Sequence, residues 1–296
     1  DNQISTSTQL SFSQASTSST ATQPLMQLNG FSQQVRNVRF EAASWLSKGA
    51  SIRPVLDFGE NSSAQTFTFE GFEFGGVIVS NGDVGYNGRK EEDKLMSVGN
   101  NHGGLVEING QWYMFYHRHT FLNQYNRQGC AEKVYFDENG QIPQVTITTS
   151  GMNPGPLSGD ASYPAVYCCN LTNGHMGALS SIGRTNQEVD FPYMTSVNEE
   201  RYITNIKDGT RIGYKYINLE ETGKIEVVYQ TDAPGELEIY TEENGERKAV
   251  ISLKPCKWWK TAETEVTFTE EKELYLVYKG EGVLSLLTLN LKGKRN

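Results

Sequence analysis

The sequence has little positive charge and no long apolar run. Its 26 Lys and Arg residues are outnumbered by 35 Asp and Glu residues, which gives a formal net charge of −9. Binding to the phosphates of nucleic acid needs a dense basic patch, so we expect no nucleic-acid partner. No stretch approaches the roughly 20 apolar residues that a membrane-spanning helix requires, so we expect no membrane partner either.

The sequence also lacks a cysteine pattern with a clear chemical meaning. Its four cysteines do not have the spacing of a metal site, and the adjacent pair is not expected to form a disulfide. They are Cys130, Cys168, Cys169 and Cys256. The pattern neither demands nor excludes an oxidising compartment. Because the chain starts at Asp1 and shows no basic segment followed by an apolar one, its cellular location has to be inferred by other means.

No charged residue occurs between Asn2 and Val35, where Ser, Thr and Gln dominate. The apolar residues of this tract follow neither the period of a strand nor that of a helix. Such a composition buries too little apolar surface to offset the entropy lost on folding. We therefore predict a low-complexity, disordered segment over residues 1–35.

Glycine and aromatic side chains are abundant, with 29 Gly and an aromatic content of 11%. From Gly75 onward, short β-branched or aromatic runs alternate with turns, and Asn109-Gly110 between two such runs is a strong hairpin signal. The predicted strands of this zone are residues 76–80, 104–108, 111–116, 133–136 and 144–148. They indicate an antiparallel meander with almost no helix.

A third zone of the sequence begins near Asn186. Here Leu237 and Ile239 alternate with Glu236 and Glu238, which is the pattern of a strand with one buried and one wet face. The predicted strands are residues 200–204, 210–217, 224–229, 235–240, 265–268, 273–278 and 284–291. Roughly seven or eight strands in this length are typical of a β-sandwich, so we expect residues 186–296 to fold on their own.

Two segments carry a family resemblance. Gly99–Gly104, followed by Asn109–Arg118, resembles the fifth-blade region of glycoside hydrolase family 43, and the resemblance continues through Arg127–Glu132 and Asp137–Ile142. It covers about residues 69–175. Residues 190–293 resemble a family 6 carbohydrate-binding module. The segments that carry this second resemblance are Tyr202–Gly209, Gly213–Tyr216, Trp259–Thr261 and Leu274–Gly280.

These resemblances imply an all-β chain with two architectures in sequence. Family 43 implies a five-bladed β-propeller that hydrolyses arabinose- or xylose-containing plant polysaccharides with inversion. The expected fold class is therefore a partial propeller, represented by its terminal blades, followed by a β-sandwich of the jelly-roll type. We predict the incomplete propeller over residues 36–180 and the carbohydrate-binding sandwich over residues 186–296.

The inverting mechanism requires two carboxyl groups, one that protonates the leaving oxygen and one that activates water. The segment Arg39–Ser44 resembles the family's third-blade motif, which makes Glu41 the candidate general acid. No residue of this chain matches the family's base, and the corresponding place holds the uncharged Ser/Thr/Gln tract. We therefore expect no turnover by this chain and leave open the alternative of a non-catalytic carbohydrate-binding protein.

The remaining candidate site residues fall in the two predicted domains. In the family, the His that matches His102 supports a metal ion, often calcium, so calcium is the expected cofactor. Arg118 is expected either to bind sugar hydroxyls or to form a structural ion pair. Trp259 is the candidate sugar-stacking ring of the sandwich, with Tyr214 and Asn290 as polar partners at one edge.

The expected partner is a plant cell-wall polysaccharide or oligosaccharide, bound by a monomer. By resemblance to the family, the expected location is outside the cytoplasm, either secreted or periplasmic.

Overall fold

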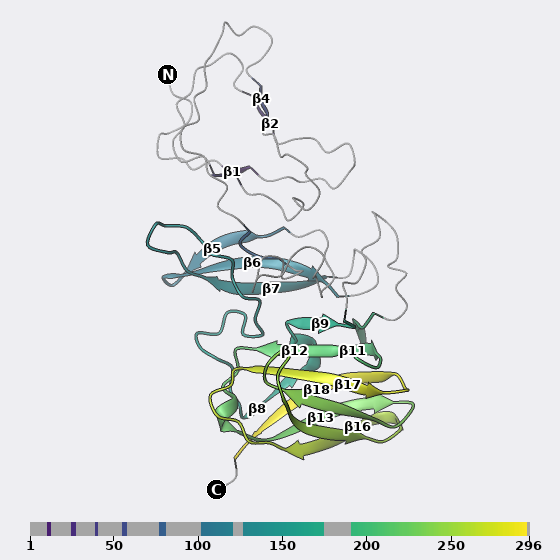
Figure 1. Ribbon diagram of the computed structural model, residues 1–296. Helices are drawn as coiled ribbons and strands as arrows, with labels where there is room; N and C mark the ends of the chain where they lie inside the picture. The colour runs from purple at the N-terminus through teal and green to yellow at the C-terminus, as the bar shows by residue number, and fades with distance from the viewer. Residues whose placement is uncertain are drawn as a thin grey trace, which may run out of the picture. The chain divides into compact units, whose positions relative to one another are not determined.

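The computed structural model describes residues 77–80, 102–120, 127–174 and 191–294, together with the backbone of four short strands nearer the N-terminus (Figure 1). These strands form two parallel pairs, β1 with β3 and β2 with β4. Their bounds are β1 Ser11–Phe12, β2 Leu25–Gln27, β3 Arg39–Phe40 and β4 Val55–Asp57. The chain divides into two compact units, Asp1–Val77 and Ile78–Asn296.

Three strands of the second unit form an antiparallel sheet in the order β5-β6-β7, which we call the blade. They are β5 (Gly104–Ile108), β6 (Gln111–His119) and β7 (Arg127–Val134). Asn109 and Gly110 have φ angles of 53° and 81°, as a two-residue hairpin turn with both central residues in the left-handed region requires. The hairpin predicted from Asn109-Gly110 is confirmed by the register of β5 and β6.

Other segments of this zone are less regular than the sequence indicated. The predicted strand over 133–136 is replaced by β7, which ends at Val134. Residues 144–148 form no strand and are held by isolated hydrogen bonds instead. Val145 N donates to Ile78 O at 2.8 Å, and Thr148 N donates to the carboxylate of Glu132 in the blade at 2.9 Å.

The β-sandwich consists of a six-stranded and a five-stranded sheet (Figure 1). The six-stranded sheet has the order β10-β11-β18-β13-β16, with β8 also paired to β18. Its strands are β8 (Ala161–Pro164), β10 (Tyr193–Val197), β11 (Glu200–Ile206), β13 (Thr222–Thr231), β16 (Cys256–Glu265) and β18 (Leu284–Gly293).

The five-stranded sheet has the order β15-β14-β17-β12-β9. Its strands are β9 (Asn170–Thr172), β12 (Arg211–Lys215), β14 (Gly235–Tyr240), β15 (Arg247–Leu253) and β17 (Glu273–Gly280). Two single 3₁₀ turns accompany the strands, η4 (Ala165–Tyr167) and η5 (Leu219–Glu221). Among the residues with described structure, no helix has the length and apolar character to cross a membrane.

The hydrophobic core lies between these two sheets. Leu237 and Ile239 are fully buried, while Glu236 and Glu238 on the same strand are not, so the predicted alternation is confirmed. The predicted strand over 265–268 is wrong, because the observed strand β16 ends at Glu265. Val266 and Phe268 nevertheless belong to the core, which explains the apolar signal there.

The sandwich includes residues from the range predicted for the propeller. Strand β8 pairs with β18, strand β9 pairs with β12, and Ala165 and Val166 of turn η4 belong to the core. The sandwich therefore begins before residue 186. Strands of three and four residues are too short to show a period-2 pattern, which is why the sequence did not reveal them.

Candidate functional site

One face of the blade borders a cleft of about 690 Å³. Strands β6 and β7 place Tyr116 opposite Cys130 and Arg118 opposite Gln128, and side chains of such cross-strand pairs lie on the same side of a sheet. The other walls of the cleft are residues 147–153 and 167–169. The cleft thus lies where the blade meets the chain segment that leads into the sandwich.

Glu132 is a buried carboxyl group in the wall of this cleft, with 2% of its surface exposed. Its Oε1 accepts hydrogen bonds from Thr148 N at 2.9 Å and from Tyr116 OH at 3.1 Å, and its Oε2 accepts one from Thr148 Oγ1 at 2.7 Å. Burial raises the pKa of Glu132 from 4.5 to about 7, although these hydrogen bonds and the charge of Arg118 act in the opposite direction. The group therefore titrates near neutral pH.

Arg118 is also buried in the wall of the cleft. Its Nε donates to Gln128 Oε1 at 2.8 Å, and its Nη2 donates to the backbone oxygens of Val166 and Cys168. Gln128 Nε2 donates to the same Val166 oxygen at 3.1 Å. These contacts give Arg118 a structural role, because they hold turn η4 against the blade. Its predicted contact with sugar hydroxyls remains a prediction.

The cysteines beside the cleft are not suited to nucleophilic catalysis. All four cysteines of the chain are free thiols. Burial raises the pKa of Cys169 to about 12, and it also raises the pKa values of Cys130 and Cys168. The thiolate is the reactive form, so these thiols are unreactive at neutral pH.

His102 lies at the face of the blade that is turned away from the cleft, next to two other histidines. Its ring meets that of His117 edge-on with 4.6 Å between centroids, and the rings of His117 and His119 are 6.1 Å apart. Calcium is bound by oxygen ligands. No group of three or more His, Cys, Asp or Glu side chains in the described part of the chain is arranged to hold a metal ion. The calcium ion expected at His102 stays a prediction.

Tyr214 is placed in the core of the sandwich. Its side chain is fully buried and its hydroxyl donates to Ala165 O at 2.9 Å. A ring without solvent exposure offers no face to a sugar. In the structure, Tyr214 therefore does not share a surface with Trp259 and Asn290, contrary to the expectation from the sequence. Its hydroxyl group instead links strand β12 to turn η4.

Trp259 and Asn290 both lie on the outer face of the six-stranded sheet. Asn290 is paired with Glu226 across β18 and β13, and Glu226 is paired with Glu263 across β13 and β16. Trp259 is on the same side as Glu263, because the two residues are separated by an even number of positions in one strand. The sequence predicted both residues as partners but did not indicate which face they share.

The outer face adds two residues that sequence reasoning missed. The ring of Tyr202 in β11 meets the ring of Trp259 with 5.3 Å between centroids. Glu226 accepts hydrogen bonds from Asn290 Nδ2 at 2.8 Å and from Lys292 Nζ. Tyr202 precedes Ile203, which is fully buried, so the alternation in this strand was the available signal. Trp258 differs from Trp259 in being 84% exposed.

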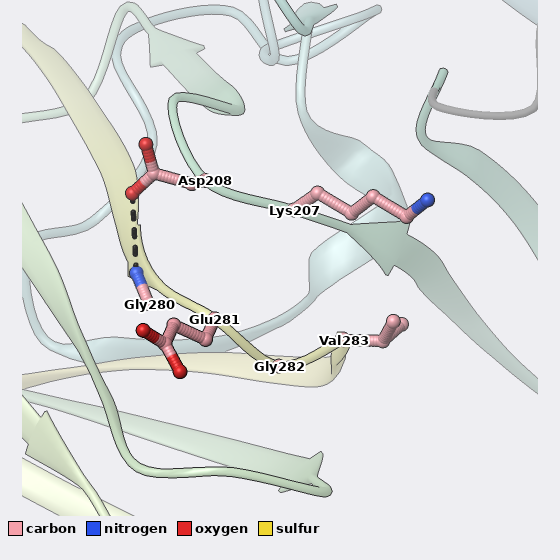
Figure 2. A pocket seen from close by; sticks show the side chains of 6 residues that line it. All are labelled: Lys207, Asp208, Gly280, Glu281, Gly282 and Val283. Carbon is pink, nitrogen blue, oxygen red and sulfur yellow. Dashed lines mark hydrogen bonds between the residues drawn. The ribbon is translucent and has the colours of Figure 1, made fainter.

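A second hollow, of about 740 Å³, lies between the β11–β12 turn and the β17–β18 turn (Figure 2). Asp208 Oδ1 accepts a hydrogen bond from Gly280 N at 3.2 Å, which ties the two turns together. Figure 2 shows the side chains of Lys207, Glu281 and Val283 spread around the hollow rather than converging on one point. We assign no function to it.

Glu41, the candidate general acid, lies outside the described residues. The cleft beside the blade has Glu132 as its one carboxyl group among the residues that line it. An inverting glycosidase needs two carboxyl groups about 6.5–9.5 Å apart. The cleft therefore does not meet this requirement, and the raised pKa of Glu132 alone does not make it a proton donor to substrate.

No model of a known protein family matches the chain. A xylosidase/arabinosidase of Thermoclostridium stercorarium is 36% identical over 229 residues, which are 75% of this chain and 48% of that protein. The chain thus spans about half the length of this curated relative.

Among solved structures, a family 43 arabinoxylan arabinofuranohydrolase from Bacillus subtilis is 13% identical with a TM-score of 0.44, over 73% of this chain and 44% of that one. A family 6 carbohydrate-binding module from Clostridium stercorarium is 11% identical with a TM-score of 0.38, over 48% of this chain and 100% of that one. The 36% identity to a xylosidase/arabinosidase agrees with the glycoside hydrolase resemblance that the sequence indicated.

Proposed function

We propose that this chain is part of a glycoside hydrolase that acts on arabinose- or xylose-containing plant polysaccharides with inversion. The observation that carries the proposal is the 36% identity over 229 residues to a xylosidase/arabinosidase. Identity at this level over three quarters of the chain is far more specific than a shared β architecture, because one fold serves many activities. Polysaccharides do not enter cells intact, so the proposal implies a secreted or periplasmic protein.

The blade residues support the proposal as scaffold rather than as catalysts. Arg118 and Glu132 are occupied by bonds that hold the blade to its neighbouring segments. Glu41 is the proposed proton donor of the reaction, and the partner carboxylate that activates water has no counterpart among the residues that the sequence offers. This division places the chemistry outside the described part of the chain.

The direct test is an assay of residues 1–296 with aryl arabinofuranosides and aryl xylosides. We expect no turnover, because a proton donor without a water-activating carboxylate lacks half of the inverting mechanism. Turnover that Glu41→Gln abolishes would establish the hydrolase and show that a base is present. Turnover unaffected by Glu41→Gln would contradict the assignment of Glu41.

A second candidate function is carbohydrate binding by the sandwich, independent of catalysis. It is favoured by the outer face of the six-stranded sheet, which carries both the ring pair of Trp259 and Tyr202 and the polar group of Asn290, Glu226 and Lys292. A sugar ring has apolar C–H faces that stack on aromatic rings and hydroxyls that exchange hydrogen bonds with amides and carboxylates. Xylan or arabinoxylan is the proposed ligand.

Trp259→Ala tests this second function by retention on an arabinoxylan affinity gel. We expect a wild-type dissociation constant on the order of 10–1,000 µM, since the contact area is small and the polar groups exchange water for hydroxyls at little net gain. The variant should lose retention and keep its thermal transition. Trp258→Ala is the matched control, because that neighbouring ring is 84% exposed and is not the one that contacts Tyr202. Retention that follows Trp258 instead would move the site to the strand edge.

A further inference from the structure

The cleft beside the blade has a composition that points to a ligand of a particular kind. Its volume of about 690 Å³ falls within the range of about 300–1,000 Å³ that is usual for small-molecule sites. Of the residues that line it, Arg118 and Glu132 are the charged ones, and they have opposite signs. Both side chains are buried and hydrogen bonded within the wall, so the lining presents no exposed charge that would select an anion or a cation.

The floor of the cleft is polar and prearranged. Glu132, Arg118 and Ser150 are all buried, and the Ser150 hydroxyl is 3.0 Å from the Thr148 hydroxyl. Glu132 accepts hydrogen bonds from Tyr116 OH, Thr148 N and Thr148 Oγ1, whereas a carboxylate offers about four lone-pair sites. A floor of this kind suits a ligand with hydroxyl groups and disfavours a purely apolar one.

The rim of the cleft supplies the apolar contact. Tyr167 of turn η4 is 49% exposed and Met152 is 47% exposed, and both line the cleft. Turn η4 is fixed from both sides, since the blade binds the oxygens of Val166 and Cys168 while Tyr214 binds that of Ala165. The ring of Tyr167 is therefore carried by a segment that is anchored to both the blade and the sandwich.

We propose that this cleft is a second carbohydrate site, which takes a neutral pentose unit with its apolar face against Tyr167 and its hydroxyls toward Ser150 and Asn153. An aromatic rim over a polar floor matches a sugar ring, which has an apolar face and a hydroxylated edge. The identity of the sugar as a pentose rests on the proposed function, while the site itself rests on the cleft. It is separate from the outer face of the six-stranded sheet.

The experiment titrates residues 1–296 with xylotriose and with arabinotriose by calorimetry. All variants are made in a Tyr202→Ala, Trp259→Ala background, which removes the ring pair proposed as the stacking surface of the sandwich. Tyr167→Ala deletes the proposed ring, and Tyr167→Phe keeps it. Tyr135→Ala is the matched control, because Tyr135 is 63% exposed and is not a lining residue of the cleft. Thermal transitions verify that each variant is folded.

We expect the background protein to keep binding one of the two sugars, Tyr167→Ala to weaken this binding at least tenfold, and Tyr167→Phe and Tyr135→Ala to leave it within twofold. Loss of all binding in the background protein, or unchanged binding in Tyr167→Ala, would overturn the proposal. Neither result touches the proposed hydrolase, which the aryl glycoside assay decides. If the wild-type protein binds sugar and the background protein does not, the sugar site is the outer face of the six-stranded sheet.

Discussion

The blade and the sandwich bury different kinds of side chain. The core between the two sheets of the sandwich consists of aliphatic and aromatic residues with one cysteine. The buried charged residues in the described part of the chain, Arg118 and Glu132, are both in the blade. The sandwich is therefore stabilised mainly by apolar burial, whereas the blade depends on bonds to buried polar groups, which are costly when a partner is lost. The blade thus contains a buried carboxyl group with a raised pKa, whereas the described core between the two sheets contains no carboxyl group.

The largest effect should come from separating the sandwich from turn η4. A fragment of residues 186–296 lacks β8, β9 and the core residues Ala165 and Val166. We expect it to show no cooperative thermal transition, while a fragment of residues 156–296 melts cooperatively. This differs from the expectation based on sequence, in which 186–296 folds alone. Equal transitions in the two fragments would mean that the sandwich does not need these strands.

The blade should respond to pH through Glu132. Its pKa is raised from 4.5 to about 7 in the folded protein, so the folded state binds more protons than the unfolded state between these values. The stability of the blade region should therefore be highest below pH 4.5 and fall as the pH rises through 7, by roughly 3 kcal/mol at about 1.36 kcal/mol per pKa unit.

Hydrogen exchange of the amides of β6 and β7, followed from pH 4.5 to 8 with correction for the intrinsic rates, measures this dependence. Glu132→Gln removes the titrating group and should flatten the curve. The amides of β14 and β17 serve as an internal control, since Glu132 is not part of their surroundings. A variant that keeps the wild-type slope would assign the titration to another group.

A change within the sandwich core tests whether polar bonds matter there as well. Tyr214→Phe removes the hydroxyl that donates to Ala165 O and leaves that oxygen buried without this donor. Because Ala165 O keeps its hydrogen bond from Cys168 N at 3.1 Å, we expect a loss of about 0.5–1.5 kcal/mol in the free energy of unfolding from urea titration. Tyr240→Phe is a matched control, because the hydroxyl of Tyr240 donates to the partly exposed Glu238 carboxylate instead. Equal losses in the two variants would show that the burial of the acceptor does not determine the cost of removing the hydroxyl.

The smallest effect should come from the ion pairs on the outer face of the six-stranded sheet. Lys224 contacts Glu263 at 2.7 Å and Glu265 at 3.2 Å, and all three side chains reach solvent. Exposed pairs of this kind contribute little because water and salt screen them. Lys224→Ala should shift the thermal midpoint less than any change above, and the shift should shrink further in 1 M salt. A shift as large as that of Tyr214→Phe would refute this ranking.

The sequence predicted β11, β12, β13, β14, β17 and β18 because the signal of these strands is local, but it did not indicate β10, β15 or β16. Strand β14 was predicted over 235–240 and is observed there, since Leu237 and Ile239 alternate with charged residues. The burial of Tyr214 could have been predicted in the same way, because Tyr214 and Ile212 point to the same side of their strand and Ile212 is fully buried. The resemblance to the family outweighed this pattern and led to the wrong surroundings for Tyr214.

What the sequence did not show depends on pairing between distant segments. The contact of Glu132 with Thr148 joins residues 16 positions apart, and the one of Arg118 with Cys168 joins residues 50 positions apart. No periodicity within either segment encodes such a pairing. The common face of Trp259 and Asn290 was hidden for the same reason, because it follows from the register of β13 with both β16 and β18.

The place of β18 in the six-stranded sheet has a consequence for how the protein is made. This strand lies between β11 and β13 and also pairs with β8, yet it follows all three in the sequence. Ser162 and Asn290, which are hydrogen bonded, are separated by 128 positions. At roughly 5–20 residues per second, a ribosome needs on the order of ten seconds to cover that interval. During this time the nascent strands expose open edges, so the sandwich is expected to need chaperone protection until β18 emerges and closes the sheet.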